Sequence, residues 1–407
     1  MRSGHGRPGS RRDRVATARR TVSDGEHPVS DAATESPARV LIAADKFKGS
    51  LTAVEVAAHV EAGLRSVVPA LSVESLPVAD GGDGTVDAAV AAGFERRTVT
   101  VTGPLGTPVE AVYALRGDTA VVEMAEASGL RHLPPGVFAP LTATTYGTGE
   151  LLRAALDAGA RTIVLGVGGS ATTDGGAGML TALGARLLDA SGQPVSPGGG
   201  PLAGLATADL GGLDPRLADT EIVLASDVDN PLLGPKGAAA VYGPQKGASP
   251  VDVEALDAAL GRFAEALGDQ RSVDAPGAGA AGGIGYGALA GLGATFRPGI
   301  EVLFEVLGFG PALERADLVI TGEGSLDEQT LHGKAPVGVA QAARARGIPV
   351  LAVCGRLALS PETLQAAGIR RAYALTDLEP DLPRCIANAA ELLEATAAVL
   401  ARDTFLV

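Results

Sequence analysis

The sequence predicts an α/β protein built on an open, largely parallel β-sheet. Three short apolar runs, residues 39–45, 317–324 and 348–355, are typical of strands buried on both faces, and each ends at a glycine or a carboxylate. Helical patterns separate these runs. The sheet is expected to have the flavodoxin-like strand order 2-1-3-4-5, in which ligands bind at the carboxyl ends of the first and third strands.

Further segments fit the same rhythm of strands and helices. Residues 73–82 and 370–377 predict two more strands of this kind. Residues 336–347 begin with proline and end with glycine, which is typical of a helix, and residues 385–402 predict an amphipathic helix.

The first strand leads directly into a helix. Thr52 and Glu55 have the spacing of a capping box, and apolar residues follow at helical intervals as Val56, Val60 and Leu64. The stretch "DKFKGS" between strand and helix is therefore expected to form a loop at a helix N-terminus.

The middle of the chain interrupts this rhythm. Residues 161–168 and 221–227 predict strands among Gly- and Pro-rich loops. We therefore expect residues 96–299 to form a second α/β domain inserted into the first, which would comprise residues 39–95 and 300–407.

The N-terminal residues 1–38 differ in composition from the remainder of the chain. They contain seven arginines and five acidic residues, a net charge of +2. Because the whole chain has a net charge of −14, residues 39–407 have a net charge of −16. Their composition predicts a disordered extension or an overlong start, with a basic interaction tail as the alternative.

Composition excludes several functional classes. The 407 residues are 46% hydrophobic and only 3% aromatic, which predicts a soluble α/β protein, and the acidic body disfavours nucleic-acid and anionic-membrane partners. Two cysteines fit a reducing cytoplasm, and the five histidines lack metal-site spacing. No apolar run approaches the ~18 residues of a membrane-spanning helix.

A Gly-rich segment in the middle of the chain predicts an anion-binding loop. Residues 164–189, "VLGVGGSATTDGGAGMLTALGARLLD", suggest a strand, a loop and a helix whose apolar face includes Leu180, Leu183 and Leu187. Such loops let backbone N–H groups approach a phosphate, although an ordinary tight turn remains the alternative. Residues 277–282 match Gly-x-Gly-x-x-Gly, but no predicted strand precedes them, so NAD is not expected.

Carboxylates and lysines gather at the predicted loops. The chain has five lysines, all in Gly-rich stretches, whereas arginine supplies its other basic residues. Carboxylates suit Mg²⁺ and lysines suit phosphate, a combination that phosphoryl transfer requires, although each residue taken alone could be a turn or cap residue. The loop carboxylates are Asp45, Asp80, Asp83, Asp174, Asp227, Asp229, Glu323 and Asp327.

Six sequence blocks, in order, resemble the bacterial type I glycerate kinase family. They are "ADKFKGSLTA", "PVADGGDGTVDA", "GVGGSATTDGGAGML", "SDVDNPLLGPKGAAAVYGPQKGA", "GAGAAGGIGYG" and "TGEGSLDEQTLHGKAPVGVA". The resemblance extends from about Val40 to the C-terminus. Two positions depart from the usual pattern, because Lys46 stands where the family more often has Ser and Asp83 where it more often has Glu.

The resemblance implies ATP-dependent phosphorylation of D-glycerate with Mg²⁺, more often giving 2-phosphoglycerate than 3-phosphoglycerate. It also implies that the inserted domain is similar to restriction-endonuclease folds. Two alternatives remain open: a kinase for another small hydroxy acid, and a non-catalytic regulatory protein that binds sugar acids.

Specific roles follow as hypotheses for residues in these blocks. The expected catalytic residues are Lys48, which would bind an anion, and Asp327 or Asp174, one of which would be the base. Mg²⁺ ligands are expected among Asp80, Asp227 and Glu323. The residues expected to bind substrate or phosphate are Asp45, Ser50, Gly168, Gly169, Ser170, Ala171, Thr172, Thr173, Gly175, Lys246, Gly279 and Lys334.

Overall fold

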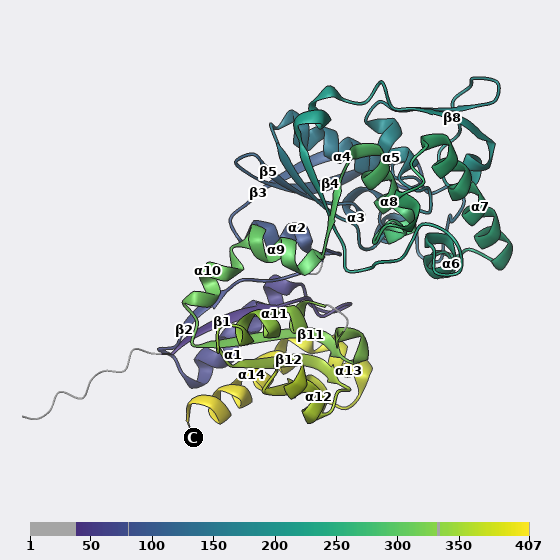
Figure 1. The fold of residues 1–407 in the computed structure, drawn as a ribbon. Helices are drawn as coiled ribbons and strands as arrows, with labels where there is room; N and C mark the ends of the chain where they lie inside the picture. The colour runs from purple at the N-terminus through teal and green to yellow at the C-terminus, as the bar shows by residue number, and fades with distance from the viewer. Residues whose placement is uncertain (1–37, 80, 332–333, 407) are drawn as a thin grey trace, which may run out of the picture. The chain divides into compact units, whose positions relative to one another are not determined.

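The computed structural model describes residues 38–79, 81–331 and 334–406 (Figure 1). Within these ranges the strands form a five-stranded sheet, a six-stranded sheet and a separate two-stranded pair. This confirms the predicted α/β class. The extension expected at residues 1–38 lies outside the described residues except for Ala38.

The five-stranded sheet is parallel throughout and has the order β13-β12-β11-β1-β2. Numbered within this sheet, that is the predicted order 2-1-3-4-5. The strand order reverses between β1 and β11, so the carboxyl ends of these two strands form the expected ligand position. The strands are β1 (Arg39–Ala44), β2 (Ser72–Ser75), β11 (Leu318–Leu326), β12 (Val350–Leu357) and β13 (Arg371–Ala374).

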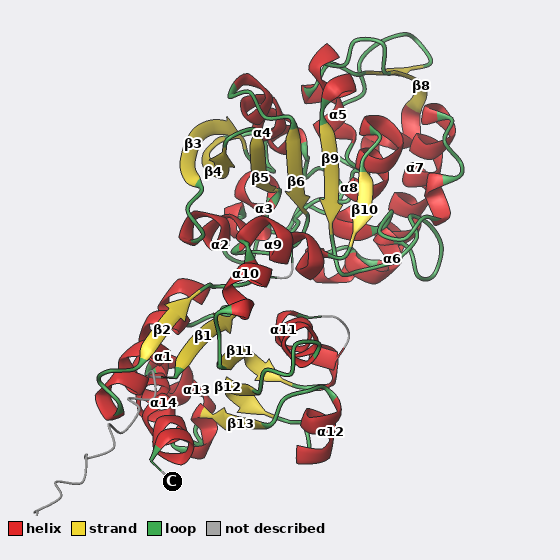
Figure 2. Ribbon diagram, turned by 60° about the vertical axis from the view of Figure 1, so that its left-hand side comes forward, coloured by secondary structure: helices red, strands yellow, loops and turns green. Residues whose placement is uncertain are grey.

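Helices cover both faces of this sheet (Figure 2). Val40 and Ile42 of β1 pack in one core cluster with helices α1 (Ala53–Val67) and α14 (Ala389–Phe405). Leu41 and Ala43 point to the opposite face and pack with α11 (Ala335–Arg344). This alternation is what a strand buried on both faces requires.

The predicted capping box at the start of α1 is confirmed. The Thr52 hydroxyl accepts a hydrogen bond from the Glu55 N–H at 3.2 Å, and the Glu55 carboxylate accepts one from the Thr52 N–H at 2.8 Å. These bonds satisfy N–H groups that the helix itself leaves without partners. They fix where α1 begins, at Ala53, directly after the N-cap residue Thr52.

The six-stranded sheet has the order β10-β9-β6-β5-β4-β3. Its first four strands are parallel, whereas β4 and β3 continue it in antiparallel pairing. The strands are β3 (Glu95–Thr102), β4 (Pro108–Arg116), β5 (Thr119–Glu123), β6 (Thr162–Gly166), β9 (Glu221–Ala225) and β10 (Thr295–Arg297), and the separate pair is β7 (Arg186–Asp189) with β8 (Leu205–Asp209).

The remaining helices are short, apart from α4 and α7. They are α2 (Thr85–Ala91), α3 (Ala125–Ser128), α4 (Tyr146–Asp157), α5 (Ala177–Ala182), α6 (Ala238–Tyr242), α7 (Pro250–Leu267), α8 (Ala280–Tyr286), α9 (Gly299–Leu307), α10 (Phe309–Glu314), α12 (Pro361–Ala366) and α13 (Leu382–Ala387). Single helical turns occupy Leu130–His132, Gly200–Gly204, Pro215–Asp219, Pro244–Lys246, Ser272–Asp274, Gly287–Gly291, Glu328–Leu331 and Leu375–Asp377.

The prediction that one helix extends from the Gly-rich loop to Leu187 was wrong. Helix α5 ends at Ala182, and Leu187 belongs to strand β7, where it pairs with Ala208. Gly184 explains the break: its φ is +113°, and a Cβ there would lie 2.1 Å from the Gly212 carbonyl oxygen. Only glycine fits such a conformation, so the chain turns into a strand instead of continuing the helix.

Three other predicted boundaries need correction. The helix expected at 385–402 is two helices, α13 and α14, separated at Asn388, whose φ of −111° and ψ of 25° are not helical. The strands expected at 73–82 and 370–377 end earlier, at Ser75 and Ala374. Loop residues 76–79 follow Ser75, and the helical turn Leu375–Asp377 follows Ala374.

Helices α2 and α9 bear on the predicted domain boundaries. Both were expected in the first domain, and Val86 of α2 and Leu303 of α9 belong to a core cluster that includes residues of both sheets, such as Leu41 of β1 and Val223 of β9. The division into two domains remains a prediction, and this shared cluster marks no boundary at either helix. None of the helices in the described ranges combines the length and the apolar character needed to cross a bilayer.

Candidate active site

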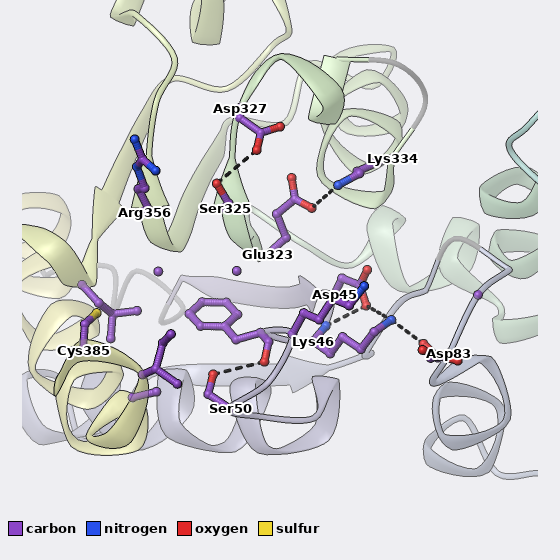
Figure 3. A pocket seen from close by; sticks show the side chains of 18 of the residues that line it. Asp45, Lys46, Ser50, Asp83, Glu323, Ser325, Asp327, Lys334, Arg356 and Cys385 are labelled. Atoms are coloured by element: carbon purple, nitrogen blue, oxygen red, sulfur yellow. Dashed lines mark hydrogen bonds and ion pairs between the residues drawn. The ribbon is translucent and has the colours of Figure 1, made fainter. Parts of the chain in front are cut away.

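A cavity of about 610 Å³ lies at the carboxyl ends of β1 and β11 (Figure 3). Its volume is within the range of about 300–1,000 Å³ typical of small-molecule sites. We call it the first cavity. It is lined by Asp45, Lys46, Phe47, Lys48, Ser50, Gly82, Asp83, Gly168, Gly169, Glu323, Gly324, Ser325, Asp327, Lys334, Gly355, Arg356, Leu375, Leu382, Cys385, Ile386 and Ala389.

A tight turn presents Lys48 to this cavity. The backbone of Phe47 and Leu51 exchanges two hydrogen bonds, of 2.8 and 3.0 Å, and Gly49 adopts a φ of +84° between them. The Ser50 hydroxyl donates to the Phe47 carbonyl at 3.1 Å and so braces the same turn. Lys48 is exposed at the tip, where its charge can reach an anion.

Lys46 connects the β1 loop to the loop before α2. Its ammonium group donates to the Asp83 carbonyl oxygen and lies 3.8 Å from the carboxylate of Asp45. Asp45 also accepts a hydrogen bond from the Lys46 backbone N–H at 2.7 Å. These contacts join the two loops and leave the Lys46 side chain partly buried.

Glu323 of β11 is a buried carboxylate of the cavity, as is Asp45, which follows β1. Glu323 accepts a hydrogen bond from the Thr330 hydroxyl, and the Lys334 ammonium group lies 3.4 Å from its other oxygen. Burial raises the pKa of Glu323, and both of these partners oppose that rise. The residue is therefore held beside a cation in a partly desolvated position.

Asp327, Ser325 and Arg356 complete the polar lining. The Ser325 hydroxyl donates to Asp327 at 3.2 Å, and the Gln329 N–H donates to its other oxygen at 2.9 Å. Ser325 pairs with Arg356 in the parallel register of β11 and β12, so both residues lie near the same edge of the sheet. Parallel pairing thus brings a carboxylate and a guanidinium group to one cavity.

A second cavity, of about 290 Å³, shares part of this lining. Lys48, Gly82, Gly168 and Gly169 line both cavities, so the two meet at these residues. The second cavity is lined by Lys48, Gly81, Gly82, Leu130, Val167, Gly168, Gly169, Ser170, Ser226, Asp227, Val228, Tyr242, Gln245, Lys246, Ala280 and Ala281.

Lys246 is the buried cation of the second cavity, with a relative exposure of 2%. Its ammonium group donates to the Ser170 hydroxyl at 3.3 Å and to the Thr172 carbonyl oxygen. Burial lowers the pKa of Lys246 to about 7, and the nearby Asp174 opposes this effect. An anion bound beside it would stabilise the charged form.

Only the first part of the predicted anion loop reaches a cavity. Gly168, Gly169 and Ser170 line the cavities, whereas Ala171, Thr172, Thr173 and Gly175 are buried and line neither. A Cβ on Gly168 would lie 2.4 Å from the Gly82 Cα, so glycine allows this loop to pack against residues 82–83. Gly279 also lines neither cavity, although the adjacent Ala280 does.

Asp174 lies outside the lining of both cavities. It is fully buried and accepts hydrogen bonds from the Thr145 N–H and hydroxyl, at 2.8 and 2.9 Å, and from the N–H groups of Gly176 and Gly178. Burial raises its pKa, and these bonds oppose the rise. The arrangement is that of a carboxylate that holds a loop to a helix start.

The expected Mg²⁺ ligands are not brought together as one set. Asp80 lies outside the described residues, Glu323 lines the first cavity and Asp227 lines the second. In the parts of the chain that the structure describes, no three His, Cys, Asp or Glu side chains are arranged as a metal site. Mg²⁺ beside a phosphate needs only one or two carboxylates, so Glu323 or Asp227 is chemically compatible with such a site.

Sequence reasoning missed part of the lining. Arg356 follows the predicted strand 348–355 directly, and its position at a strand end could have identified it. Leu382 and Ile386, four residues apart on α13, form an apolar wall that no motif indicated. Nothing in the sequence marks these two residues as part of a site, because their exposure is known only from the structure.

Comparison with known proteins identifies the family. A model described as "Glycerate kinase family" matches residues 40–404. The chain belongs to the glycerate kinase family. As a member of this family it is a kinase, and therefore a transferase.

Curated proteins and a solved structure of this family are similar to the chain over most of their length. A glycerate kinase from Bacillus subtilis (strain 168) is 48% identical over 366 residues, which cover 88% of this chain and 96% of the relative. A "Glycerate 2-kinase" from Escherichia coli (strain K12) is 46% identical, with 83% and 90% covered. A crystal structure from Salmonella typhimurium LT2, provisionally named glycerate kinase 2, has a TM-score of 0.78 and 46% identity, with 90% and 98% covered.

Proposed function

We infer that the protein transfers the γ-phosphoryl group of ATP to a hydroxyl group of D-glycerate. The observation that carries this proposal is a cavity of about 610 Å³ in which the cations Lys48, Lys334 and Arg356 occur together with the carboxylates Glu323 and Asp327. Phosphoryl transfer requires positioning and charge neutralisation more than covalent chemistry. Family membership supplies the substrate class.

In this reaction a glycerate hydroxyl oxygen forms a bond to the γ-phosphorus as the bond from phosphorus to the β–γ bridging oxygen breaks. The products are phosphoglycerate, ADP and the proton released by the hydroxyl group. A carboxylate that lines the cavity can accept this proton. Asp327 meets that condition, whereas the buried Asp174 does not, so we propose Asp327 as the base and a structural role for Asp174.

Lys48 has the leading role among the cations in this proposal. It is exposed at the tip of a braced turn and lines both cavities, so its charge can neutralise a group that passes between them. Lys334 and Lys246 would each neutralise charge within one cavity. Gly168, Gly169 and Ser170 would offer backbone and hydroxyl donors to phosphate oxygens.

We propose that Mg²⁺ accompanies ATP, held by phosphate oxygens with one or two of Asp80, Asp227 and Glu323. When bound, the ion would neutralise charge on the phosphates. Glu323 fits this role because its carboxylate lines the first cavity and supplies the oxygen ligands that Mg²⁺ prefers.

The favoured product is 2-phosphoglycerate. The proposal depends on the name of the Escherichia coli relative, "Glycerate 2-kinase", which is 46% identical to this chain over 344 residues. We further propose that the enzyme acts in the cytoplasm, since both cysteines, Cys354 and Cys385, are unpaired and buried in a way that suits reducing conditions.

A coupled assay of ADP release tests the activity. Purified protein would be given Mg-ATP with D-glycerate, L-glycerate, glycolate, lactate and tartronate in parallel. The proposal predicts the highest kcat/KM with D-glycerate. Preference for another acid would establish a different hydroxy-acid kinase, and binding of glycerate without ADP release from any acid would establish a non-catalytic binding protein.

Phosphorus NMR of the product tests the position of transfer. The resonances of 2- and 3-phosphoglycerate are distinguished by adding authentic standards to the reaction mixture. Growth of the 2-phosphoglycerate signal from the earliest time points is the expected result. Initial formation of 3-phosphoglycerate would contradict the proposed regiochemistry while leaving the kinase activity intact.

A further inference from the structure

The first cavity has two chemically different ends. Figure 3 shows Cys385 on one side of the view and Lys334, Lys46 and Asp83 on the other. On the side with Cys385, helix α13 also contributes Leu382 and Ile386 to the lining, and Figure 3 shows Arg356 of β12 on this side as well. The other side carries the loops that follow β1 and β11. One cavity therefore offers an apolar wall and a charged region.

The apolar wall, formed by Leu382 and Ile386, is unusual because these large hydrophobic side chains are exposed to solvent. Leu382 is 46% exposed and Ile386 is 48% exposed, although both are aliphatic residues that a folded protein normally covers. Leu375 lines the cavity near them and is fully buried, as is most of Cys385. An exposed apolar surface that lines a concave site is typical of a ligand contact.

The charged region continues toward the second cavity. Lys48, Gly168 and Gly169 line both cavities, and Lys334 lines the first. The second cavity, at about 290 Å³, has less than half the volume of the first and is lined by the buried Lys246 with Ser170 and Gln245, and by the carboxylate of Asp227. It is thus a small site equipped for a compact anion.

We propose that the apolar wall of Leu382 and Ile386 binds the adenine base of ATP, and that the second cavity binds the carboxylate of the acceptor acid through Lys246. The triphosphate would extend from the wall past Lys334 to Lys48, where the cavities meet and transfer occurs. This assignment rests on the proposed kinase function and specifies which cavity takes which substrate.

The opposite assignment fits the chemistry less well. A purine has apolar faces that gain from contact with Leu382 and Ile386, whereas glycerate, whose three carbons carry two hydroxyl groups and a carboxylate, has no surface to match them. A triphosphate nucleotide also needs the larger volume. The buried ammonium group of Lys246, in turn, gains most from a carboxylate that reaches it in the smaller site.

An Ile386→Asp variant tests the adenine wall. Its KM for ATP should rise at least tenfold while its KM for D-glycerate stays within twofold, because a carboxylate on the wall removes apolar contact and repels the nucleotide. Leu378→Asp is the matched control, since Leu378 is also 48% exposed but lines neither cavity. Equal KM values for ATP in wild type and Ile386→Asp would overturn the assignment.

Lys246→Met and Gln245→Ala test the second cavity. Each should raise the KM for D-glycerate, by at least tenfold and about threefold respectively, with the KM for ATP within twofold. Gln245 is exposed, so its variant should fold even if replacement of the buried Lys246 prevents folding. An increase in the KM for ATP instead of D-glycerate would contradict the assignment.

A binding measurement separates this proposal from the kinase activity itself. A fluorescent ADP analogue titrated into the wild type and into Ile386→Asp reports nucleotide binding without turnover. Weaker binding by Ile386→Asp supports the adenine wall even if no acid is phosphorylated by the wild type. An active wild type with unchanged analogue affinity in Ile386→Asp would refute the wall and leave the kinase function standing.

Discussion

At the residue scale, Lys48 illustrates how a single charge is placed. Its turn is closed by backbone bonds between Phe47 and Leu51, by a Ser50 side-chain bond and by the positive φ of Gly49. The sequence indicated a loop before a capped helix, and the motif resemblance selected Lys48 over Lys46. The structure adds the contact of Lys46 with Asp83, which explains how two lysines two positions apart differ.

We predict that Lys48→Ala lowers kcat/KM by about 100- to 1,000-fold, or about 3–4 kcal/mol of transition-state stabilisation. The reason is loss of the cation that lines both cavities. Steady-state kinetics with ATP and D-glycerate provide the measurement. Lys236→Ala is the control, since Lys236 is exposed and lines neither cavity; equal losses in both variants would argue against a specific role for Lys48.

Glu123 is a second residue whose environment has a measurable consequence. It is buried at the end of β5, and one of its oxygens accepts hydrogen bonds from the N–H groups of Gly84 and Val86. Its other oxygen has no partner among the residues that the structure describes. Burial, followed by the charge of Glu126, raises the pKa of Glu123 to about 7.

A raised carboxyl pKa favours folding at low pH. The contribution of Glu123 to the free energy of unfolding is fully present below pH 4.5, the pKa of the carboxyl group in the unfolded chain. It is lost as the pH rises to about 7, the pKa in the folded protein. Glu123→Gln should therefore show a smaller fall in the free energy of unfolding between pH 5 and pH 8 than the wild type, by up to about 3 kcal/mol. Urea unfolding at both pH values measures the difference.

Glu110→Gln serves as the control for this experiment, because Glu110 is exposed on β4. Its pH dependence should match that of the wild type. If Glu123→Gln also matches the wild type, the Glu123 carboxyl group titrates normally and its burial has no effect on folding.

At the scale of elements, the sequence predicted which segments form strands and helices better than where they end. The capping box placed the start of α1 correctly because it is a local feature of Thr52 and Glu55. The prediction of a helix that includes Leu187 was wrong because the chain turns at Gly184. The backbone of Gly184 packs against Gly212, a residue 28 positions further along the chain, with no room for a side chain. Element ends that depend on such distant contacts have no local signal.

The contact between α1 and α14 supplies a test at this scale. A Cβ on Gly63 would lie 2.3 Å from the Glu394 carbonyl oxygen and 2.7 Å from the Ala397 Cβ. We predict that Gly63→Ala destabilises the protein by about 1–3 kcal/mol, because overpacking outweighs the better helix propensity of alanine. Thermal or urea unfolding would measure the change.

Gly204→Ala is the matched control for Gly63→Ala, since no heavy atom lies within 4 Å of its added Cβ. Its stability should stay within about 0.5 kcal/mol of the wild type, as is usual for open surface sites. A stable Gly63→Ala protein would mean that α1 and α14 can separate without cost.

At the scale of the whole molecule, the family match begins at residue 40 and leaves the N-terminal arginine-rich residues outside it. A chain that starts at Pro37 should therefore keep kcat/KM for both substrates within about twofold and an unchanged melting temperature. Side-by-side kinetics and thermal unfolding of the two chains give the comparison. A large rise in either KM would assign residues 1–36 a part in substrate binding, as a basic tail could provide.

The sequence by itself determined the α/β class, the order of the five-stranded sheet, the family and the residues Lys48, Glu323, Asp327 and Lys334 that line the first cavity. These depend on local periodicity and on motifs that lie within single loops. Tertiary structure decided what the motifs could not. Only folding places Lys246 in a second cavity and buries Asp174 outside the lining of both cavities. Folding also brings Leu382 and Ile386 into the same cavity as Lys48, which follows β1. Burial and proximity arise from packing between segments that lie tens to hundreds of residues apart, which no local pattern encodes.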